Sequence, residues 1–327
     1  MARVLVTGAA GFIGSSLVKQ LVTDGHIVIG VDNLITGKLE NLQPVRRQMD
    51  FQQFDIRERD AIAKLCARVD VIFHEAALPS VPKSVLDPAT SHMHNVEGTL
   101  SLLLAARDAG VPRVVYAASS SAYGESVILP KHEGMPTAPI SPYAVQKLAG
   151  EHYMQSFARV YGMETVCLRY FNVFGPCQAA DSPYSGVLAK FITSMLTGTA
   201  PTICGDGTQS RDFTYVQNVV RANIQAASAP GEAVSGKVYN IACGERHTLL
   251  DTYETLARLT GFSGPPKIAP PRKGDILHSQ ADIARARQDL SYEPEVGFEE
   301  GLSRTVEWYA QQMRADAEAV EPEQIAV

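Results

Sequence analysis

The chain has 327 residues, of which 45% are hydrophobic and 20% are charged. This ordinary globular usage argues against disorder, collagen-like repeats and coiled coil, and the length predicts two domains or one large α/β unit with a cap. The 29 Lys and Arg against 35 Asp and Glu give a net charge of -6. No basic field is therefore available to attract nucleic acid or an acidic membrane.

Neither a run of about 18 apolar residues nor a signal-peptide pattern occurs, so we expect a cytoplasmic protein without a membrane segment. The five cysteines are odd in number and widely spaced, and none forms a C-x-x-C pair. This spacing favours reduced core thiols and indicates neither a disulfide framework nor a metal site.

The first half of the chain alternates short β-rich apolar runs with amphipathic helical stretches. Alternating strands and helices form βαβ crossovers and a parallel sheet. We therefore predict an α/β fold with a doubly wound parallel sheet, in which the strands are residues 4–7, 26–32, 69–74, 113–118 and 165–170.

Beyond Gly175, frequent Gly and Pro turns break the chain into short pieces and predict a smaller, loop-rich α/β lobe that holds the substrate. Residues 217–229 are predicted as a helix, and residues 237–242 as a buried strand that could join the first sheet. We expect the lobes to interleave and the end after Arg314 to be frayed. The predicted first domain is 1–172 with 215–242, the second is 173–214 with 243–316, and the tail is 317–327.

The first strand leads directly into a glycine-rich turn, Gly8-x-x-Gly11-x-x-Gly14, and a helix beginning near Phe12. The missing side chains let a pyrophosphate approach the N–H groups at a helix N-terminus. The second strand ends at Asp32, where a carboxylate can accept hydrogen bonds from ribose hydroxyls and would repel a 2′-phosphate. This combination predicts a Rossmann fold that binds NAD rather than NADP, with cofactor contacts from Gly8, Gly11, Phe12, Ile13, Gly14, Asp32 and Asn33.

Two further segments could reach the cofactor. Asp55 and Ile56 follow an additional short strand expected between residues 32 and 55 and could contact the adenine, although an ordinary loop acid explains Asp55 nearly as well. Ala76 and Ala77 follow the predicted strand 69–74, where small residues would admit the cofactor, and core packing is the alternative explanation.

The reacting groups are predicted on a helix that Ser141-Pro142 opens as N-cap and first helical residue. Tyr143 and Lys147 are four residues apart and share one helix face. A phenol with a pKa of about 10 is a poor base, but a neighbouring ammonium and a positive nicotinamide both favour the phenolate. Tyr143 could then take a proton from a sugar hydroxyl while hydride leaves the same carbon.

Five motifs occur in order: the glycine turn, a serine run ending in Tyr-Gly, Tyr-x-x-x-Lys, Arg-Tyr-Phe-Asn-Val-Phe-Gly at 169–175 and Gly-Asp-Gly-x-x-x-Arg-Asp-Phe at 205–213. With these motifs, residues 1–309 resemble the extended short-chain dehydrogenase/reductases. Within them, the chain is most similar to the nucleotide-sugar 4-epimerases that act on UDP-N-acetylglucosamine or UDP-galactose.

The resemblance implies site residues by position. Tyr143, Lys147 and Ser119 match the catalytic residues, Ser120 is close enough to share the role of Ser119, and Tyr170 belongs to the cofactor site. It also implies a homodimer that pairs helices at 88–108 and 142–161. The residues implied in binding the UDP-sugar are Asn172, Gly186, Val187, Arg211, Arg272, Asp275 and Ser279. Arginine suits a diphosphate through bidentate bonds, although a single surface arginine is more often a solvated charge.

The choice of reaction depends on the residues after Ser119. Dehydratases that the chain resembles place Asp-Glu there and decarboxylases place Glu, whereas this chain has Ser120 and Ser121. Elimination lacks its proton donor, so we predict reversible C4 epimerisation of a UDP-hexose through a 4-keto sugar and bound NAD. Ser279 matches a gate at which a small residue admits an N-acetyl group.

Three alternatives stay open. The protein could be a UDP-glucuronate 4-epimerase or a decarboxylase, although the sequence identifies no extra cation for a uronate. From another class, it could be an NAD-binding regulator without catalysis.

Overall fold

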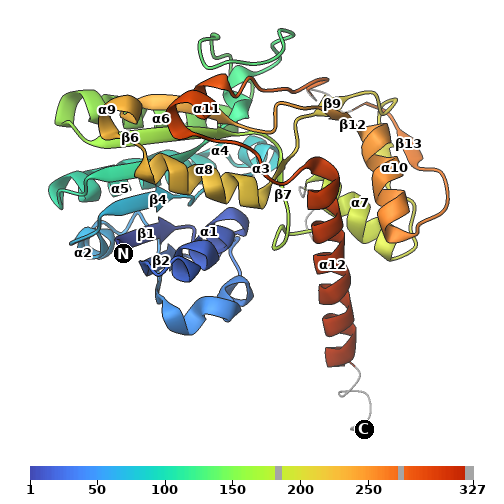
Figure 1. The fold of residues 1–327 in the computed structure, drawn as a ribbon, viewed down its shortest axis with the longest axis horizontal. Coiled ribbons are helices and arrows are strands. Elements are labelled where there is room, and N and C mark those ends of the chain that lie inside the picture. Colours follow the sequence, from blue (N-terminus) through green and yellow to red (C-terminus); the bar gives the residue numbers. More distant parts are fainter. Residues whose placement is uncertain (181–185, 272–275, 321–327) are drawn as a thin grey trace.

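The computed structural model describes residues 1–180, 186–271 and 276–320. Its larger part is a seven-stranded parallel sheet between two layers of helices (Figure 1). The sheet order is β11-β6-β5-β4-β1-β2-β3. Strands β2 and β3 are added on one side of β1 and the later strands on its other side, so the order of connection reverses between β1 and β4, which is where open α/β sheets bind ligands. This order confirms the predicted doubly wound fold. The strands are β1 (Arg3–Thr7), β2 (Ile27–Asp32), β3 (Asp50–Gln53), β4 (Val71–His74), β5 (Arg113–Ser119), β6 (Glu164–Tyr170) and β11 (Lys237–Ile241).

Helices cover both faces of the sheet because its strands are apolar on both faces. Val4 packs with Leu17 in one buried cluster, and Leu5 packs with Leu102 and Met154 in the other. The first cluster includes residues of α1 (Phe12–Thr23), η1 (Leu39–Gln48), α8 (Val216–Ser228), α9 (Gly231–Val234) and α11 (Ala284–Leu290). The second includes residues of α2 (Arg59–Cys66), α5 (Gly98–Asp108) and α6 (Pro142–Tyr161).

Short helical segments connect β4 and β5 to the helices that follow them. The chain between β4 and α5 forms α3 (Val81–Leu86), α4 (Pro88–His92) and a π-helical turn, η2 (Met93–Glu97). A 3-10 turn, η3 (Ser120–Tyr123), follows β5 directly and places the serine run at the carboxyl edge of the sheet.

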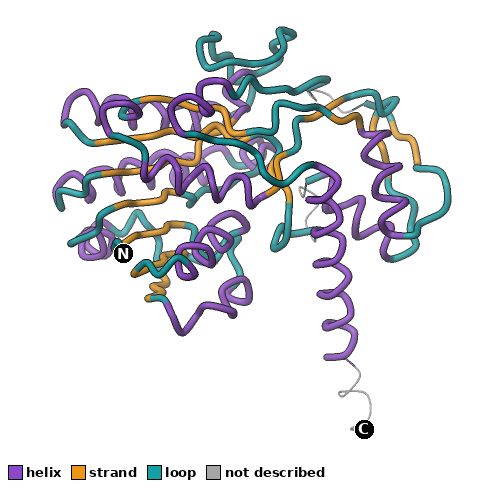
Figure 2. The backbone as a smooth tube through the Cα atoms, viewed as in Figure 1, coloured by secondary structure: helices purple, strands orange, loops and turns teal. Residues whose placement is uncertain are grey.

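The smaller lobe has its own buried cluster, which includes Phe174, Phe191 and Leu302. Figure 2 shows its helices beside short strands and long loops, in agreement with the predicted loop-rich lobe. Its helices are α7 (Val187–Leu196), α10 (Leu249–Thr260) and α12 (Phe298–Val320). Its strands are β7 (Val173–Phe174), β8 (Thr202–Cys204), β9 (Ser210–Arg211), β10 (Thr214–Tyr215), β12 (His247–Thr248) and β13 (Lys267–Ala269).

The interleaving of the lobes is confirmed, because β11 pairs with β6 in parallel after the chain has left the sheet. The fraying predicted after Arg314 is wrong for residues 315–320, since α12 continues to Val320, and the rest of the predicted tail lies outside the described residues. The residues concerned are mainly Ala and Glu, which are strong helix formers. The exact domain boundaries stay a prediction. Within the described ranges, no helix is long and apolar enough to cross a membrane.

Candidate active site

The glycine turn after β1 leaves no room for side chains. A Cβ atom on Gly14 would lie 2.0 Å from the Gly8 carbonyl oxygen, and one on Gly8 would lie 2.7 Å from the Ala76 nitrogen. Gly11 is the N-cap of α1, and the helix has neither a side-chain cap nor an acidic residue in its first turn. The positive end of α1 is therefore open to an anion, which fits a dinucleotide pyrophosphate held between Gly8 and Gly14. Ala76 abuts this turn at the end of β4.

Asp32 is held beside the same turn at the end of β2. Its carboxylate accepts hydrogen bonds from the Ala10 N–H at 3.0 Å and the Leu34 N–H at 2.8 Å. Burial raises the pKa of Asp32, and these two N–H groups oppose the increase. Gly37 packs closely against this carboxylate, because a Cβ atom there would lie 2.8 Å from Asp32 Oδ2.

Asn33 and Asp55 meet next to Asp32. The Asn33 amide donates to Asp55 at 2.9 Å, and Asp55 also pairs with Arg57 at 2.9 Å. Burial opposes ionisation of Asp55, but its bonds to Arg57 outweigh burial and hold its pKa well below the usual range. Ile56 is 7% exposed and packs against Gly98. Ala77 is partly buried beyond β4. Contacts with a cofactor stay predictions for Asn33, Asp55, Ile56 and Ala77.

The predicted catalytic residues converge at the end of β5. Ser141 caps α6 by accepting from the Ala144 N–H at 3.2 Å, as predicted. Tyr143 in the first turn hydrogen-bonds to Ser119, and Lys147 is buried one turn later with its ammonium 4.6 Å from the centre of the Tyr116 ring. Ser120 starts η3 directly after Ser119.

The acidity of Tyr143 differs from the sequence-based expectation. Burial raises its pKa to about 12, and the bond from Ser119 only partly opposes this. Burial also lowers the pKa of Lys147 to about 8. Burial therefore disfavours the phenolate, whereas a positive charge near the hydroxyl, such as that expected from a bound nicotinamide, would favour it.

Glu75 is a candidate functional residue that sequence reasoning missed. It follows β4, and its carboxylate accepts from the Tyr170 hydroxyl at 2.7 Å, while the Asn223 amide donates to that hydroxyl at 2.8 Å. Burial raises the pKa of Glu75 to about 7, and its charge favours the ammonium form of Lys147. The sequence feature that could have identified Glu75 is its position as a single acid between the apolar strand β4 and Ala76.

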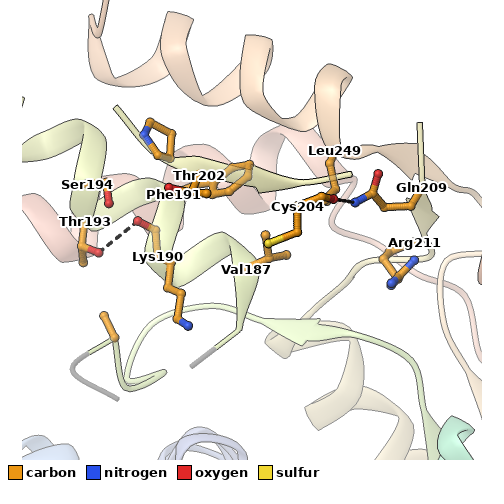
Figure 3. Close-up of a pocket in the computed structure, with 12 residues that line it drawn as sticks. Val187, Lys190, Phe191, Thr193, Ser194, Thr202, Cys204, Gln209, Arg211 and Leu249 are labelled. Carbon is orange, nitrogen blue, oxygen red and sulfur yellow. Dashed lines mark hydrogen bonds between the residues drawn. The ribbon is translucent and has the colours of Figure 1, made fainter. Parts of the chain in front are cut away.

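The predicted substrate residues gather around β9 in the smaller lobe. A cavity of about 580 Å³ is lined by Val187 and Arg211 together with Lys190 and Phe191 (Figure 3). The Arg211 guanidinium donates to the carbonyls of Ser210 at 3.0 Å and Leu277 at 3.1 Å. The cavity therefore presents two positive side chains, Arg211 and Lys190, beside the apolar side chains of Val187 and Phe191, which suits a nucleotide with a phosphate.

Asn172, Gly186 and Ser279 do not line this cavity but contact or adjoin residues next to those that do. Asn172 has a φ of 36°, and its amide donates to the Asp212 carbonyl at 3.2 Å. Gly186 precedes α7, and a Cβ there would lie 3.2 Å from Gln178. Ser279 is 7% exposed, and its N–H donates to the Ser210 carbonyl at 3.0 Å. Two predicted residues, Arg272 and Asp275, lie outside the described residues.

The chain is similar over nearly its whole length to several UDP-sugar epimerases. It is 40% identical to a UDP-glucose 4-epimerase from Mycolicibacterium smegmatis over 311 residues, which are 94% of this chain and 98% of the relative. The structure of UDP-N-acetylglucosamine 4-epimerase from Methanobrevibacter ruminantium M1, in complex with UDP-N-acetylmuramic acid, is 40% identical with a TM-score of 0.91. That match covers 95% of this chain and 99% of the other.

A third similar protein has a different substrate in its name. UDP-glucuronic acid 4-epimerase from Bacillus cereus, in complex with UDP-glucuronic acid and NAD, is 33% identical with a TM-score of 0.88, over 95% of this chain and 99% of the other. The model of the NAD dependent epimerase/dehydratase family matches residues 4–242, which include both the glycine turn and the tyrosine and lysine of α6. The chain therefore belongs to the NAD-dependent epimerase/dehydratase family.

Proposed function

We propose that the protein is an NAD-dependent UDP-sugar 4-epimerase that acts on UDP-N-acetylglucosamine, UDP-glucose or both. The observation that carries this proposal is the convergence of Tyr143, Lys147 and Ser119 at the carboxyl edge of the sheet, on the edge where the glycine turn also lies. The names of the similar proteins support the same reaction with several UDP-sugars.

In the proposed reaction, one set of residues binds NAD and another transfers the proton of the sugar hydroxyl. Gly8, Gly14 and Asp32 would hold NAD, which supplies a reversible acceptor for the C4 hydride when it is bound. Tyr143 takes the proton from O4 as the C4 hydrogen leaves, and it returns that proton when the 4-keto sugar is reduced on its other face. Ser119 orients O4 through its hydroxyl.

The surroundings of Ser119 favour epimerisation over elimination. Its Oγ accepts from the N–H of Ser121 at 3.2 Å and from the Ser121 hydroxyl at 2.9 Å. Both residues after Ser119 are serines, so this turn supplies no carboxyl group to protonate a leaving group at C6. Return of hydride to C4 is then the expected fate of the 4-keto sugar.

The proposal is tested by incubating the purified protein separately with UDP-N-acetylglucosamine, UDP-glucose and UDP-glucuronate and separating the C4 isomers by chromatography. We expect both of the first two sugars to be interconverted with their C4 isomers. Conversion of UDP-glucuronate alone would support the uronate epimerase, and release of CO₂ would support the decarboxylase. NAD binding without conversion of any sugar would support a regulator and overturn the proposal.

Ser279→Tyr is expected to change the sugar preference. A tyrosine at this 7% exposed position would crowd an N-acetyl group, at a cost of about 1–3 kcal/mol and a loss of about 10-fold or more in kcat/KM for UDP-N-acetylglucosamine. UDP-glucose should be affected less. Ser228→Tyr, on the exposed end of α8, is the control. Equal kcat/KM for UDP-N-acetylglucosamine in Ser279→Tyr and the parent would contradict the gate.

Glu75→Gln is expected to shift the pH dependence of kcat. Above its pKa of about 7, the Glu75 carboxylate stabilises the Lys147 ammonium, whose pKa is about 8. Without this charge the pKa of Lys147 falls further, so the alkaline loss of activity should begin at lower pH, while rates below pH 7 change little. Profiles of kcat against pH would be compared with those of Glu40→Gln in exposed η1. Superimposable profiles would exclude this role.

We also propose a cytoplasmic homodimer. Val145, Val160 and Tyr161 are 52%, 66% and 49% exposed on α6, so this helix offers apolar surface for a second copy. Light scattering should then give twice the chain mass of 35.3 kDa. A monomeric mass at micromolar concentration would contradict the dimer.

A further inference from the structure

Lys131 lies in the loop between η3 and α6, and its backbone is fixed between the sheet and the segment that carries Ser279. Its N–H donates to the Gln280 carbonyl at 2.8 Å, and its carbonyl accepts from the Asn240 amide at 2.9 Å. Its side chain is almost completely buried, with 2% of the residue exposed. The direction of this side chain is therefore set by the fold.

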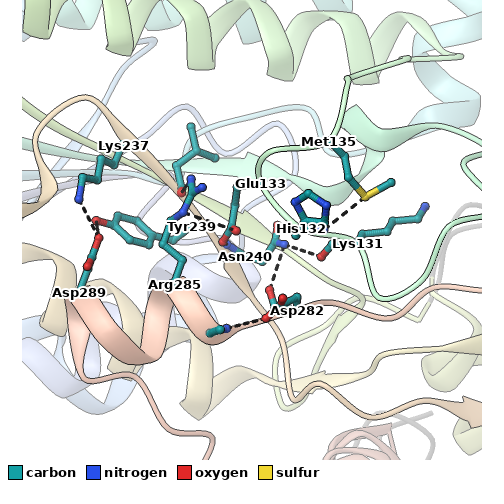
Figure 4. Close-up of polar contacts among 12 residues, drawn as sticks. Lys131, His132, Glu133, Met135, Lys237, Tyr239, Asn240, Asp282, Arg285 and Asp289 are labelled. Carbon is teal, nitrogen blue, oxygen red and sulfur yellow. Dashed lines mark hydrogen bonds and ion pairs between the residues drawn. The ribbon is translucent and has the colours of Figure 1, made fainter.

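Among the described residues, the ammonium of Lys131 has no carboxylate counter-ion. It donates to the Gly124 carbonyl at 3.2 Å and lies 5.9 Å from the centre of the Tyr123 ring. In the described part of the chain, no carboxylate oxygen lies within 4.0 Å of it. Figure 4 shows its side chain running away from Glu133.

The carboxylate of Glu133 is already engaged with other groups. It accepts from the Asn240 N–H at 2.8 Å and pairs with Arg285 at 3.7 Å. Burying a charge without a partner is unfavourable, so the ammonium of Lys131 is costly unless an anion completes its environment.

The residues around this ammonium adjoin predicted site residues along the chain. Gly124 ends the turn that begins at Ser119, and Gln280 follows Ser279 directly. Burial, and then the like charge of Arg211, lower the pKa of Lys131. Two cations from different lobes therefore act on the same region of a protein whose net charge is -6. Such a local reversal of charge favours an anionic ligand.

We propose that Lys131 is a further substrate-binding residue, whose ammonium contacts an anionic oxygen of the sugar nucleotide beside Arg211. This inference rests on the proposed function, because it assumes that a UDP-sugar occupies this site. Two parts of such a ligand carry this chemistry, namely the diphosphate and, in a uronate, the C6 carboxylate. A charge-assisted hydrogen bond to either would replace the missing counter-ion.

The test measures binding to the NAD-loaded protein by calorimetry with UDP, UDP-N-acetylglucosamine and UDP-glucuronate, in the parent and in Lys131→Met. Loss of a charge-assisted bond should weaken binding about 10-fold to 100-fold. Lys131→Gln keeps a donor for the Gly124 carbonyl and removes only the charge, so it serves if Lys131→Met is poorly folded. Lys237→Met is the matched control, because Lys237 pairs with Asp289 at 2.9 Å, and its side chain is 45% exposed.

The three ligands distinguish the two anions. Equal weakening for all three ligands would assign Lys131 to the diphosphate, and weakening for UDP-glucuronate alone would assign it to the carboxylate. Unchanged affinity for all three ligands in a folded variant would overturn the inference. Binding of UDP does not depend on turnover, so a parent protein that binds UDP but converts no sugar would contradict the proposed function instead.

Discussion

Replacing Tyr143 by Phe is expected to lower kcat for C4 epimerisation about 10²-fold to 10⁴-fold, the usual contribution of a general acid–base group. The substitution removes only the hydroxyl that hydrogen-bonds to Ser119 and would accept the O4 proton. Turnover is measured by separating the C4 isomers of UDP-N-acetylglucosamine and UDP-glucose.

Two controls show that such a loss would be chemical rather than structural. The aromatic ring is kept, so the thermal midpoint and the amount of NAD that copurifies should match the parent protein. Tyr161→Phe, at the half-exposed end of the same helix, should retain full activity. A kcat of Tyr143→Phe within threefold of the parent value would remove the phenol from the mechanism and leave Lys147 or Ser119 to move the proton.

Replacing Glu151 by Ala is expected to destabilise the protein more than any other substitution considered. Its carboxylate forms two bonds with the Arg169 guanidinium, at 2.9 and 2.6 Å, and both side chains are less than 5% exposed. Removal of one partner leaves a buried charge without compensation and typically costs about 3–5 kcal/mol. We expect a clear fall in the thermal midpoint, measured at fixed NAD concentration because bound NAD also stabilises the fold.

The comparison variant for this pair is Glu299→Ala. Glu299 also pairs with an arginine, Arg258, at 2.9 Å, but both side chains are more than 60% exposed. Solvent screens such a pair, so the thermal midpoint should not change measurably. A double variant that replaces Glu151 by Leu and Arg169 by Met should recover much of the lost stability, because no lone charge remains. Equal midpoints for Glu151→Ala and Glu299→Ala would show that burial of the pair is unimportant.

The sheet was predictable because its signals are local. Each long strand is an apolar run bounded by turn residues, and the glycine turn, the start of α1 and the Ser141 cap all depend on neighbouring residues. The two-residue strands β7, β9, β10 and β12 were not predicted. A pair of residues has no periodicity, and these pairs are strands only because distant segments align them.

The site was predictable where a motif fixes both residue type and spacing, as for Tyr143 and Lys147. Glu75 and Lys131 were missed because their chemistry depends on the folded surroundings. Glu75 meets Tyr170, which is 95 positions away, and Lys131 is notable only because folding places none of the described acids beside its ammonium. The effect of burial on the pKa of Tyr143 could not be predicted for a related reason, since desolvation is a property of the fold and not of a spacing.

The late arrival of β11 has a consequence for synthesis of the protein. As translation proceeds, β6 leaves the ribosome with one edge satisfied by β5, while its other edge must wait for Lys237–Ile241. During this interval the nascent chain exposes unpaired backbone groups next to apolar side chains, which is the kind of edge that aggregates. Slow elongation between Tyr170 and Lys237, or lack of a chaperone, should therefore reduce the yield of native protein far more than a delay after Ile241.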